Sequence, residues 1–358
     1  MVIGAVSANG QGCVCARLIP PPFDMARAGL VGVEENSYLA PHQFSASLSF
    51  RWLHSFREFH GSQELPYPTD KFLYANTHVY GYDLSAIYQA TPRVSVSLEI
   101  PFSYGSRLSY YEHDFVHKHA MHASGIGDMR LIGNVWLFKP DTNPEGNISI
   151  GLGVKFPTGD YDAKDISYRA TGAVVRPVDP AIQPGDGGWG VVTQLNAFRQ
   201  LFPRIFAYAQ GIYLINPRDI NGVQQPTGDE PDFTLGKFGY TFNSVPDQYL
   251  ARSGLDYVIW PKAGLSLSLG WRVEGVPVED FLGGSRGWRN AGYAFSIEPG
   301  LSVAKGRFSF SVTGPVALVR HADKNLTDIQ VSRQLHADFG GNAAFADYLV
   351  TASASYRF

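Results

Sequence analysis

The strongest constraint in this sequence is an alternation of apolar and polar residues that repeats at every second position. From Phe44 to Trp52 every second residue is apolar, and the residues between them are three serines and an arginine. Successive side chains of a β-strand point to opposite faces, so such a strand has one apolar and one polar face. The alternation returns near residues 94–103, 128–137, 148–156, 265–274, 293–303, 308–318 and 347–358. The pattern predicts an all-β protein.

Four further segments with weaker alternation bring the predicted total to about twelve strands. They are Tyr80–Tyr88, Val191–Phe198, Ile205–Ile215 and Tyr249–Trp260; Ile205–Ile215 is ambiguous because both of its faces carry apolar residues. Most of the strands have the ~9–11 residues that a strand needs to cross a bilayer. The sequence has no apolar run near the ~18 residues of a membrane helix. Its mean hydropathy is only -0.11, because the average combines the apolar and the polar faces of the strands.

The connections between these strands differ in length in a regular way. Short turns are expected near residues 91–93, 203–204, 261–263 and 305–306, with a modest one at 139–146. Long segments are expected near 55–75, 105–125, 157–187, 216–246, 275–290 and 320–343. This segregation is typical of outer-membrane barrels, in which the turns are periplasmic and the loops extracellular. With an even number of strands, both termini fall on the side of the short turns.

A soluble β-sandwich also alternates, but its exposed face is polar and its apolar face forms the core. In this chain the polar face consists mainly of Ser, Gly, Arg and Glu, which suits a water-containing lumen better than an exterior rich in Lys and Glu. Aromatic residues gather at strand ends, as in the interfacial girdles of membrane barrels, although Trp136 has the parity of the lumen. We therefore predict an antiparallel transmembrane β-barrel over residues 42–358, located in the bacterial outer membrane.

Residues 1–41 are predicted to lie outside the barrel, as a residual signal and a periplasmic extension. Met1–Ala8 is short and apolar and ends in Val-Ser-Ala, like the end of a secretory signal peptide. Cys13 and Cys15 are separated by a single residue, which would strain a disulfide between them. A flexible tail is preferred here over a metal site or a lipid anchor.

Two features of the sequence resemble known membrane barrels. The chain ends in Tyr356-Arg357-Phe358, which resembles the terminal aromatic signature that the barrel-assembly machinery recognises, so Phe358 is the expected contact with that partner. Gly125–Leu131 (GIGDMRL) and Ile148–Gly159 (ISIGLGVKFPTG) resemble the MetA-like family of outer-membrane proteins, which is linked by name to phenol degradation. The resemblance implies a barrel that passes small, often hydrophobic molecules, and it brings no catalytic residues.

The polar faces of the strands carry charges that are predicted to line the lumen. The candidates are Arg51, Asp83, Glu99, Asp128, Arg130, Lys155, Arg252, Asp256, Arg272, Glu274, Glu298, Asp347 and Arg357. Their signs nearly balance, so neither an anion-selective nor a cation-selective pore is indicated. Two interpretations stay open: an ion-pair network that props the barrel, and a path for a solute. About twelve strands enclose more space than the ~8 whose side chains fill the interior and less than the 16–18 of open porins.

The most distinctive chemical cluster lies in the segment 110–122 (YYEHDFVHKHAMH). Four imidazoles, those of His113, His117, His119 and His122, stand within ten residues and could bind Zn, Ni or Cu on a mobile loop. His-rich tracts are also simple compositional signals, so a solvated extracellular loop is the alternative. A pH-sensitive lid is a third possibility, since His titrates near neutrality.

The sequence therefore predicts an outer-membrane channel for the passive passage of small molecules, hydrophobic or aromatic ones among them. The alternative is a non-conducting barrel that binds a ligand, a metal or another envelope protein through its loops. A net charge of -3 argues against a nucleic-acid partner. No nucleophile and base are fixed by spacing, so an enzyme is not predicted. The expected partners are outer-membrane lipid and a small solute, and no cofactor is predicted.

Overall fold

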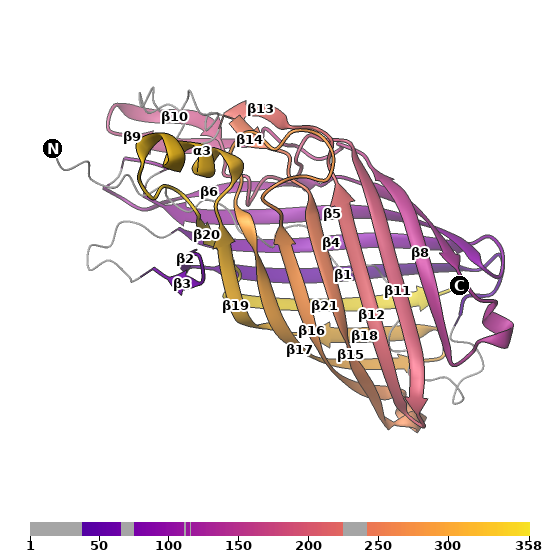
Figure 1. The fold of residues 1–358 in the computed structure, drawn as a ribbon. Helices are drawn as coiled ribbons and strands as arrows, with labels where there is room; N and C mark the ends of the chain where they lie inside the picture. Colours follow the sequence, from indigo (N-terminus) through magenta and orange to yellow (C-terminus); the bar gives the residue numbers. More distant parts are fainter. Residues whose placement is uncertain (1–37, 66–74, 111, 115, 225–241) are drawn as a thin grey trace.

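A closed antiparallel β-barrel of twelve strands forms the protein, as the alternation predicts (Figure 1). The computed structural model describes residues 38–65, 75–110, 112–114, 116–224 and 242–358. The wall strands are β1 (Phe44–Ser55), β4 (Asn76–Gln89), β5 (Val94–Ser109), β7 (Arg130–Trp136), β8 (Gly146–Lys155), β11 (Gly190–Phe202), β12 (Ile205–Ile215), β15 (Gln248–Trp260), β16 (Leu265–Val276), β17 (Ala291–Lys305), β18 (Phe308–Thr313) and β21 (Tyr348–Arg357). The first strand, β1, pairs with the last, β21, from Ser45–Arg357 to His54–Tyr348, and this closes the wall.

Two of the wall strands are interrupted and continue as separate segments. β6 (His119–Ile126) pairs with the C-terminal half of β5, whereas β7 pairs with its N-terminal half. β19 (Val316–Asp323) continues β18 along β17 after a break at residues 314–315. Pro315 has no N–H to donate to a ladder, which explains why the hydrogen bonding stops there.

The short connections lie at one end of the barrel and the long ones at the other (Figure 1). The short end holds the 3-10 turns η1 (Pro140–Thr142) and η2 (Pro261–Ala263) and the C-terminus. The long connections include small strand pairings among β2 (Glu58–His60), β3 (Gln63–Glu64) and β20 (Asn342–Ala344), between β9 (Lys164–Arg169) and β10 (Gly172–Pro177), and between β13 (Ile220–Gln224) and β14 (Phe242–Ser244). The segments expected to be loops are thus partly strands, and β5 and β6 extend the wall through much of residues 105–125.

One helix, α3 (Leu326–Leu335), lies among the long connections, where the sequence analysis expects only a loop. It begins with a capping box: the Asn325 side chain accepts from the Asp328 N–H, and the Asp328 carboxylate accepts from the Asn325 N–H. Because Asp328 is buried, its pKa is raised to about 7. Among the described residues no helix is long and apolar enough to span a bilayer.

The two faces of the wall differ as the alternation predicts. Large apolar side chains point outward and are strongly exposed, including Leu152 at 64% and Trp271 at 58%. Most of the inward positions between them are small, polar or charged, and they are buried. Residues 1–37 lie outside the described part of the chain, so the predicted signal remnant and Cys13 and Cys15 remain untested.

An arginine on the outward face will therefore destabilise the barrel in lipid. Leu269 lies in the middle of β16 and is 56% exposed. We expect Leu269→Arg to lower the free energy of unfolding in a bilayer by about 2–4 kcal/mol, because the charge leaves water for hydrocarbon. Denaturant unfolding of the protein in vesicles, followed by tryptophan fluorescence, measures this change. Leu269→Ala is the control, and an equal effect of the two substitutions would contradict a lipid-facing position.

Candidate functional site

The barrel interior gathers most of the charged residues that the sequence assigns to the lumen. Nine of the thirteen are at most 6% exposed: Arg51, Asp83, Glu99, Arg130, Lys155, Asp256, Arg272, Glu274 and Glu298. A charge removed from water is costly unless an opposite charge and hydrogen bonds compensate it. Most of these side chains therefore form ion pairs.

The first group of pairs lies on neighbouring strands β4, β5 and β7. The Arg130 guanidinium approaches Asp83 at 2.8 Å and Glu99 at 2.7 Å. The strand register brings them together, since Glu99 stands opposite Arg130 in the ladder between β5 and β7. One arginine thus holds two carboxylates against the inner wall.

The second group joins β8 to a loop folded into the barrel mouth. Lys155 forms ion pairs with Asp128, at 3.5 Å, and with Asp186. Asp128 lies between β6 and β7, outside a regular strand, and its carboxylate accepts from the Gly159 and Asp186 N–H groups. Asp186 was not among the predicted lumen residues.

Residues 178–188 form this loop, which we call the plug loop, and nearly every one of its residues is buried. Ile182 packs against Gly105 of β5 so closely that a Cβ at Gly105 would lie 2.5 Å from the Ile182 Cβ. Asp179 pairs with Arg107 at 3.6 Å. The sequence predicts an extracellular loop here, because its Gly- and Pro-rich composition is common to many loops and does not indicate the inward fold.

The third group of pairs crosses the lumen. Glu298 binds Arg252 at 3.0 Å and Arg272 at 3.3 Å, and Arg272 also binds Glu274 at 2.7 Å. Glu274 on β16 then approaches Arg51 on β1 at 3.5 Å. Strands β17, β18 and β21 separate β16 from β1 along the wall, so this last contact bridges the interior instead of following the wall.

Three other predicted lumen residues take different roles. Asp347 precedes β21 and binds Arg57 at 2.5 Å, near the long connections. Arg357 lies at the short-turn end and donates to the Tyr38 carbonyl at 3.3 Å. Asp256 has no ion-pair partner among the described residues, and its side chain interacts with the Ser266 hydroxyl.

Apolar side chains also occupy the interior. Ile132, Val192, Ile212, Leu214 and Leu250 form a buried cluster on β7, β11, β12 and β15. The sequence analysis did not assign these residues to the lumen. The apolar character of both faces of Ile205–Ile215 was the available signal, because the second apolar face of β12 belongs to this cluster.

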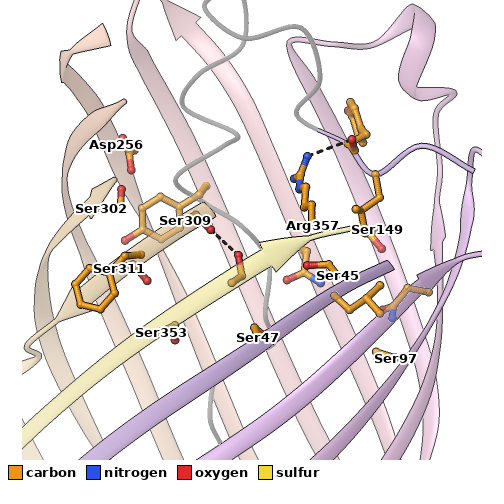
Figure 2. Close-up of a pocket in the computed structure, with 18 of the residues that line it drawn as sticks. Ser45, Ser47, Ser97, Ser149, Asp256, Ser302, Ser309, Ser311, Ser353 and Arg357 are labelled. Atoms are coloured by element: carbon orange, nitrogen blue, oxygen red, sulfur yellow. Dashed lines mark hydrogen bonds between the residues drawn. The ribbon is translucent and has the colours of Figure 1, made fainter. Parts of the chain in front are cut away.

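A cavity of about 190 Å³ occupies the short-turn half of the lumen (Figure 2). One side is lined by serines of β1, β21, β18 and β17, including Ser47, Ser353, Ser309 and Ser302. Hydroxyl pairs connect neighbouring strands there, as between Ser309 and Ser355 at 2.5 Å. Amides and aromatic rings line the other side, and Arg252 and Glu298 belong to the lining as well.

Tyr38 closes part of the short-turn end of this cavity. Its ring meets Trp136 edge-on at a centroid distance of 5.2 Å and Phe198 at 5.9 Å. Its hydroxyl donates to the Asn143 carbonyl at 2.8 Å. These contacts explain the lumen parity of Trp136: its ring packs inside the barrel against Tyr38 and is not part of the outer girdle.

The four histidines of residues 110–122 have different surroundings. His117 binds Asp114 at 2.7 Å, and His122 approaches Asp165 at 3.5 Å. The rings of His113 and His119 pack against Tyr168. In the part of the chain that the structure describes, no group of three or more His, Cys, Asp or Glu side chains could hold a metal ion. The predicted metal site therefore gains no geometric support.

His113 is fully buried, and this burial lowers its pKa to about 4; the neighbouring His119 acts in the same direction. Its Nδ1 accepts from the Tyr168 N–H at 3.0 Å, and its Nε2 has no partner among the described residues. The folded loop thus holds a neutral imidazole, which an unfolded chain would protonate at a pKa near 6.5.

Acid will loosen the loop around His113. Because the folded pKa lies below the unfolded one, the stabilisation is complete above pH ~6.5 and is lost as the pH falls towards 4. We expect faster amide hydrogen exchange in residues 105–125 at pH 5 than at pH 7.5, after correction for intrinsic rates. In His113→Asn this extra acceleration should disappear; its persistence would show that another group titrates.

The shared carboxylate of Glu298 will contribute more to stability than a surface carboxylate. Glu298→Gln removes the charge that faces Arg252 and Arg272, and Arg252 has no other ion-pair partner among the described residues. We expect unfolding in lipid to become easier by about 3–5 kcal/mol. Glu64→Gln is the control, since the exposed Arg57–Glu64 pair should contribute only ~0–1 kcal/mol. Similar losses in both variants would contradict a buried network.

Comparison with solved structures supports the fold. The crystal structure of the COG4313 outer membrane channel from Pseudomonas putida F1 is similar over 96% of this chain and 100% of that one, with a TM-score of 0.57 and 12% identity. A Pseudomonas aeruginosa FadL homologue (TM-score 0.42, 9% identity, 99% and 98% covered) and the P. putida toluene transporter TodX (0.40, 11%, 98% and 98%) are more distant. No protein-family model and no curated protein matches the sequence. The fold is that of an outer-membrane channel.

Proposed function

We propose that the protein is a passive channel of the bacterial outer membrane for small molecules. The observation that carries this proposal is the lumen cavity of about 190 Å³, which lies beneath a layer of paired charges and the plug loop. A solute small enough for the cavity would diffuse along the lumen when the plug loop moves. The COG4313 channel, whose fold is similar, is itself described as an outer membrane channel.

The paired charges suit the passage of neutral solutes. Each lumen cation in the three groups of pairs faces a carboxylate, and the five cations and six carboxylates together leave a net charge of only -1. An ion would also have to displace a bound partner from a buried pair, which is costly. The resemblance to the MetA-like family makes small hydrophobic or aromatic molecules candidate solutes.

The plug loop is the expected barrier, because the Lys155–Asp186 pair and the Ile182 contact hold it inside the mouth. We expect the wild-type protein in planar bilayers to show a small conductance. Replacement of residues 179–186 by a Gly/Ser linker of equal length should raise the conductance and the flux of small solutes several-fold. The same kind of replacement at the exposed residues 170–173, the tip of the β9–β10 hairpin, is the control.

No current and no solute flux in either protein would overturn the channel proposal. That outcome would favour a non-conducting barrel that docks an envelope partner through its long connections. Two observations favour this second function: the Arg51–Glu274 contact crosses the lumen, and the buried plug loop lies in its mouth. We also infer that the protein is no enzyme and that Phe358 mediates recognition by the barrel-assembly machinery.

A further inference from the structure

The residues that line the cavity in the short-turn half of the lumen include buried polar atoms that have no hydrogen-bond partner among the described residues. They come from six residues around its lining: Asn134 Oδ1, Gln194 Nε2, Asp256 Oδ1, Ser302 Oγ, Thr313 Oγ1 and Thr351 Oγ1. Four of these residues, Gln194, Asp256, Ser302 and Thr351, are more than nine-tenths buried. Buried polar groups are nearly always hydrogen-bonded in folded proteins, so this concentration in one cavity points to a ligand.

Asp256 stands out because no cation among the described residues pairs with it. The other predicted lumen carboxylates of the wall strands, such as Glu298 and Glu99, form ion pairs. The Asp256 side chain interacts with the Ser266 hydroxyl, and Figure 2 shows it among the residues that line the cavity. A carboxyl group in such a lining can accept a hydrogen bond from a donor on a solute.

The free atoms include both donors and acceptors. Gln194 Nε2 can only donate, Asp256 Oδ1 and Asn134 Oδ1 accept, and the Ser and Thr hydroxyls do either. A hydrocarbon would leave all of them unsatisfied, and an organic cation would satisfy only the acceptors. An anion would satisfy only the donors. A neutral molecule with several hydroxyl groups both donates and accepts, so it matches the whole set.

Aromatic rings provide the remaining element of the cavity. Tyr38, Trp136 and Tyr208 belong to the lining opposite the serine-rich strands. A ring with axial C–H groups can pack against such faces while its hydroxyls reach the polar side. Gly254 and Gly270 make room for Tyr208, since a Cβ on either would lie within 2.9 Å of its hydroxyl.

We propose that this cavity is a binding site for a neutral polyhydroxylated solute, such as a polyol or a monosaccharide-sized ring, with Asp256 as its main acceptor. This inference rests on the proposed channel function and names its solute class. It differs from the hydrophobic candidates that the MetA-like resemblance brings, because the chemistry of the lining favours hydrogen bonding over hydrocarbon contact.

Binding can be measured without transport, which separates this inference from the channel proposal. We would titrate the full-length protein in detergent micelles with myo-inositol and, separately, with toluene, by saturation-transfer NMR. We expect inositol, but not toluene, to receive saturation from the wild-type protein. Asp256→Leu, which keeps the side-chain volume, should weaken inositol binding about tenfold, as the loss of a buried hydrogen bond does.

Thr351 supplies a second, milder variant in case Asp256→Leu fails to fold. Thr351→Val removes the free hydroxyl at constant shape and should weaken inositol binding several-fold, whereas Thr351→Ser keeps the hydroxyl and should bind as the wild type does. Asp162→Asn, at an exposed loop carboxylate, should have no effect. Preferential binding of toluene, no binding of inositol, or equal binding by Thr351→Val and the wild type would overturn the inference. Inositol binding without conductance would leave it standing while the channel proposal fails.

Discussion

The pairing of β1 with β21 is the interaction on which the rest of the structure depends. In hydrocarbon no water can satisfy a free backbone N–H or C=O, so a membrane sheet must close on itself. The register from Ser45–Arg357 to His54–Tyr348 closes this sheet, and it places polar residues of β1 opposite polar residues of β21 and apolar residues opposite apolar ones. A shift by one residue would turn the serines and charges of β1 into the lipid and its leucines and phenylalanines into the lumen. The register that closes the barrel therefore also keeps the apolar face towards the lipid and the polar face towards the lumen.

Once the wall is closed, the charges inside it must compensate one another. The arrangement that costs the least free energy pairs charges on neighbouring strands, as for Asp83, Glu99 and Arg130. The contact between Arg51 and Glu274 is different, because it links opposite parts of the wall and restricts the lumen. The same electrostatic requirement therefore stabilises the barrel and narrows its path. The proposed passage of small neutral solutes follows from this arrangement, since opening the barrier for an ion would break a pair.

The sequence predicts the wall well and the contents of the lumen less well. Alternation in strands such as β1 and β16 reflects a periodicity that lipid and lumen impose on every residue, so face and strand can be read from the chain alone. The partner of a lumen charge depends on barrel shape: nothing near Arg51 points to Glu274, more than two hundred residues away. The inward fold of the plug loop, the ring of Tyr38 against Trp136 and the helix after Asn325 depend on tertiary contacts in the same way. In the His-rich segment the four imidazoles have different surroundings, so nearness in sequence does not by itself define a site.

Asp256 shows why the solute class can be argued from the structure but not from composition. In the sequence it is one acidic residue among a nearly balanced set, and the balance suggests only mutual neutralisation. The structure pairs Glu298 and Glu274 with Arg252, Arg272 and Arg51, so the cations of this crossing group are already engaged. Asp256 is left facing hydroxyls and a cavity. The net charge of the lumen is thus near zero, but its charged groups are not evenly placed. The ion pairs form a layer above a cavity that is lined mainly by hydroxyl and amide groups. Under the proposed function, hydrogen bonding in the cavity would select the solute, and the ion pairs above it would disfavour charged ones.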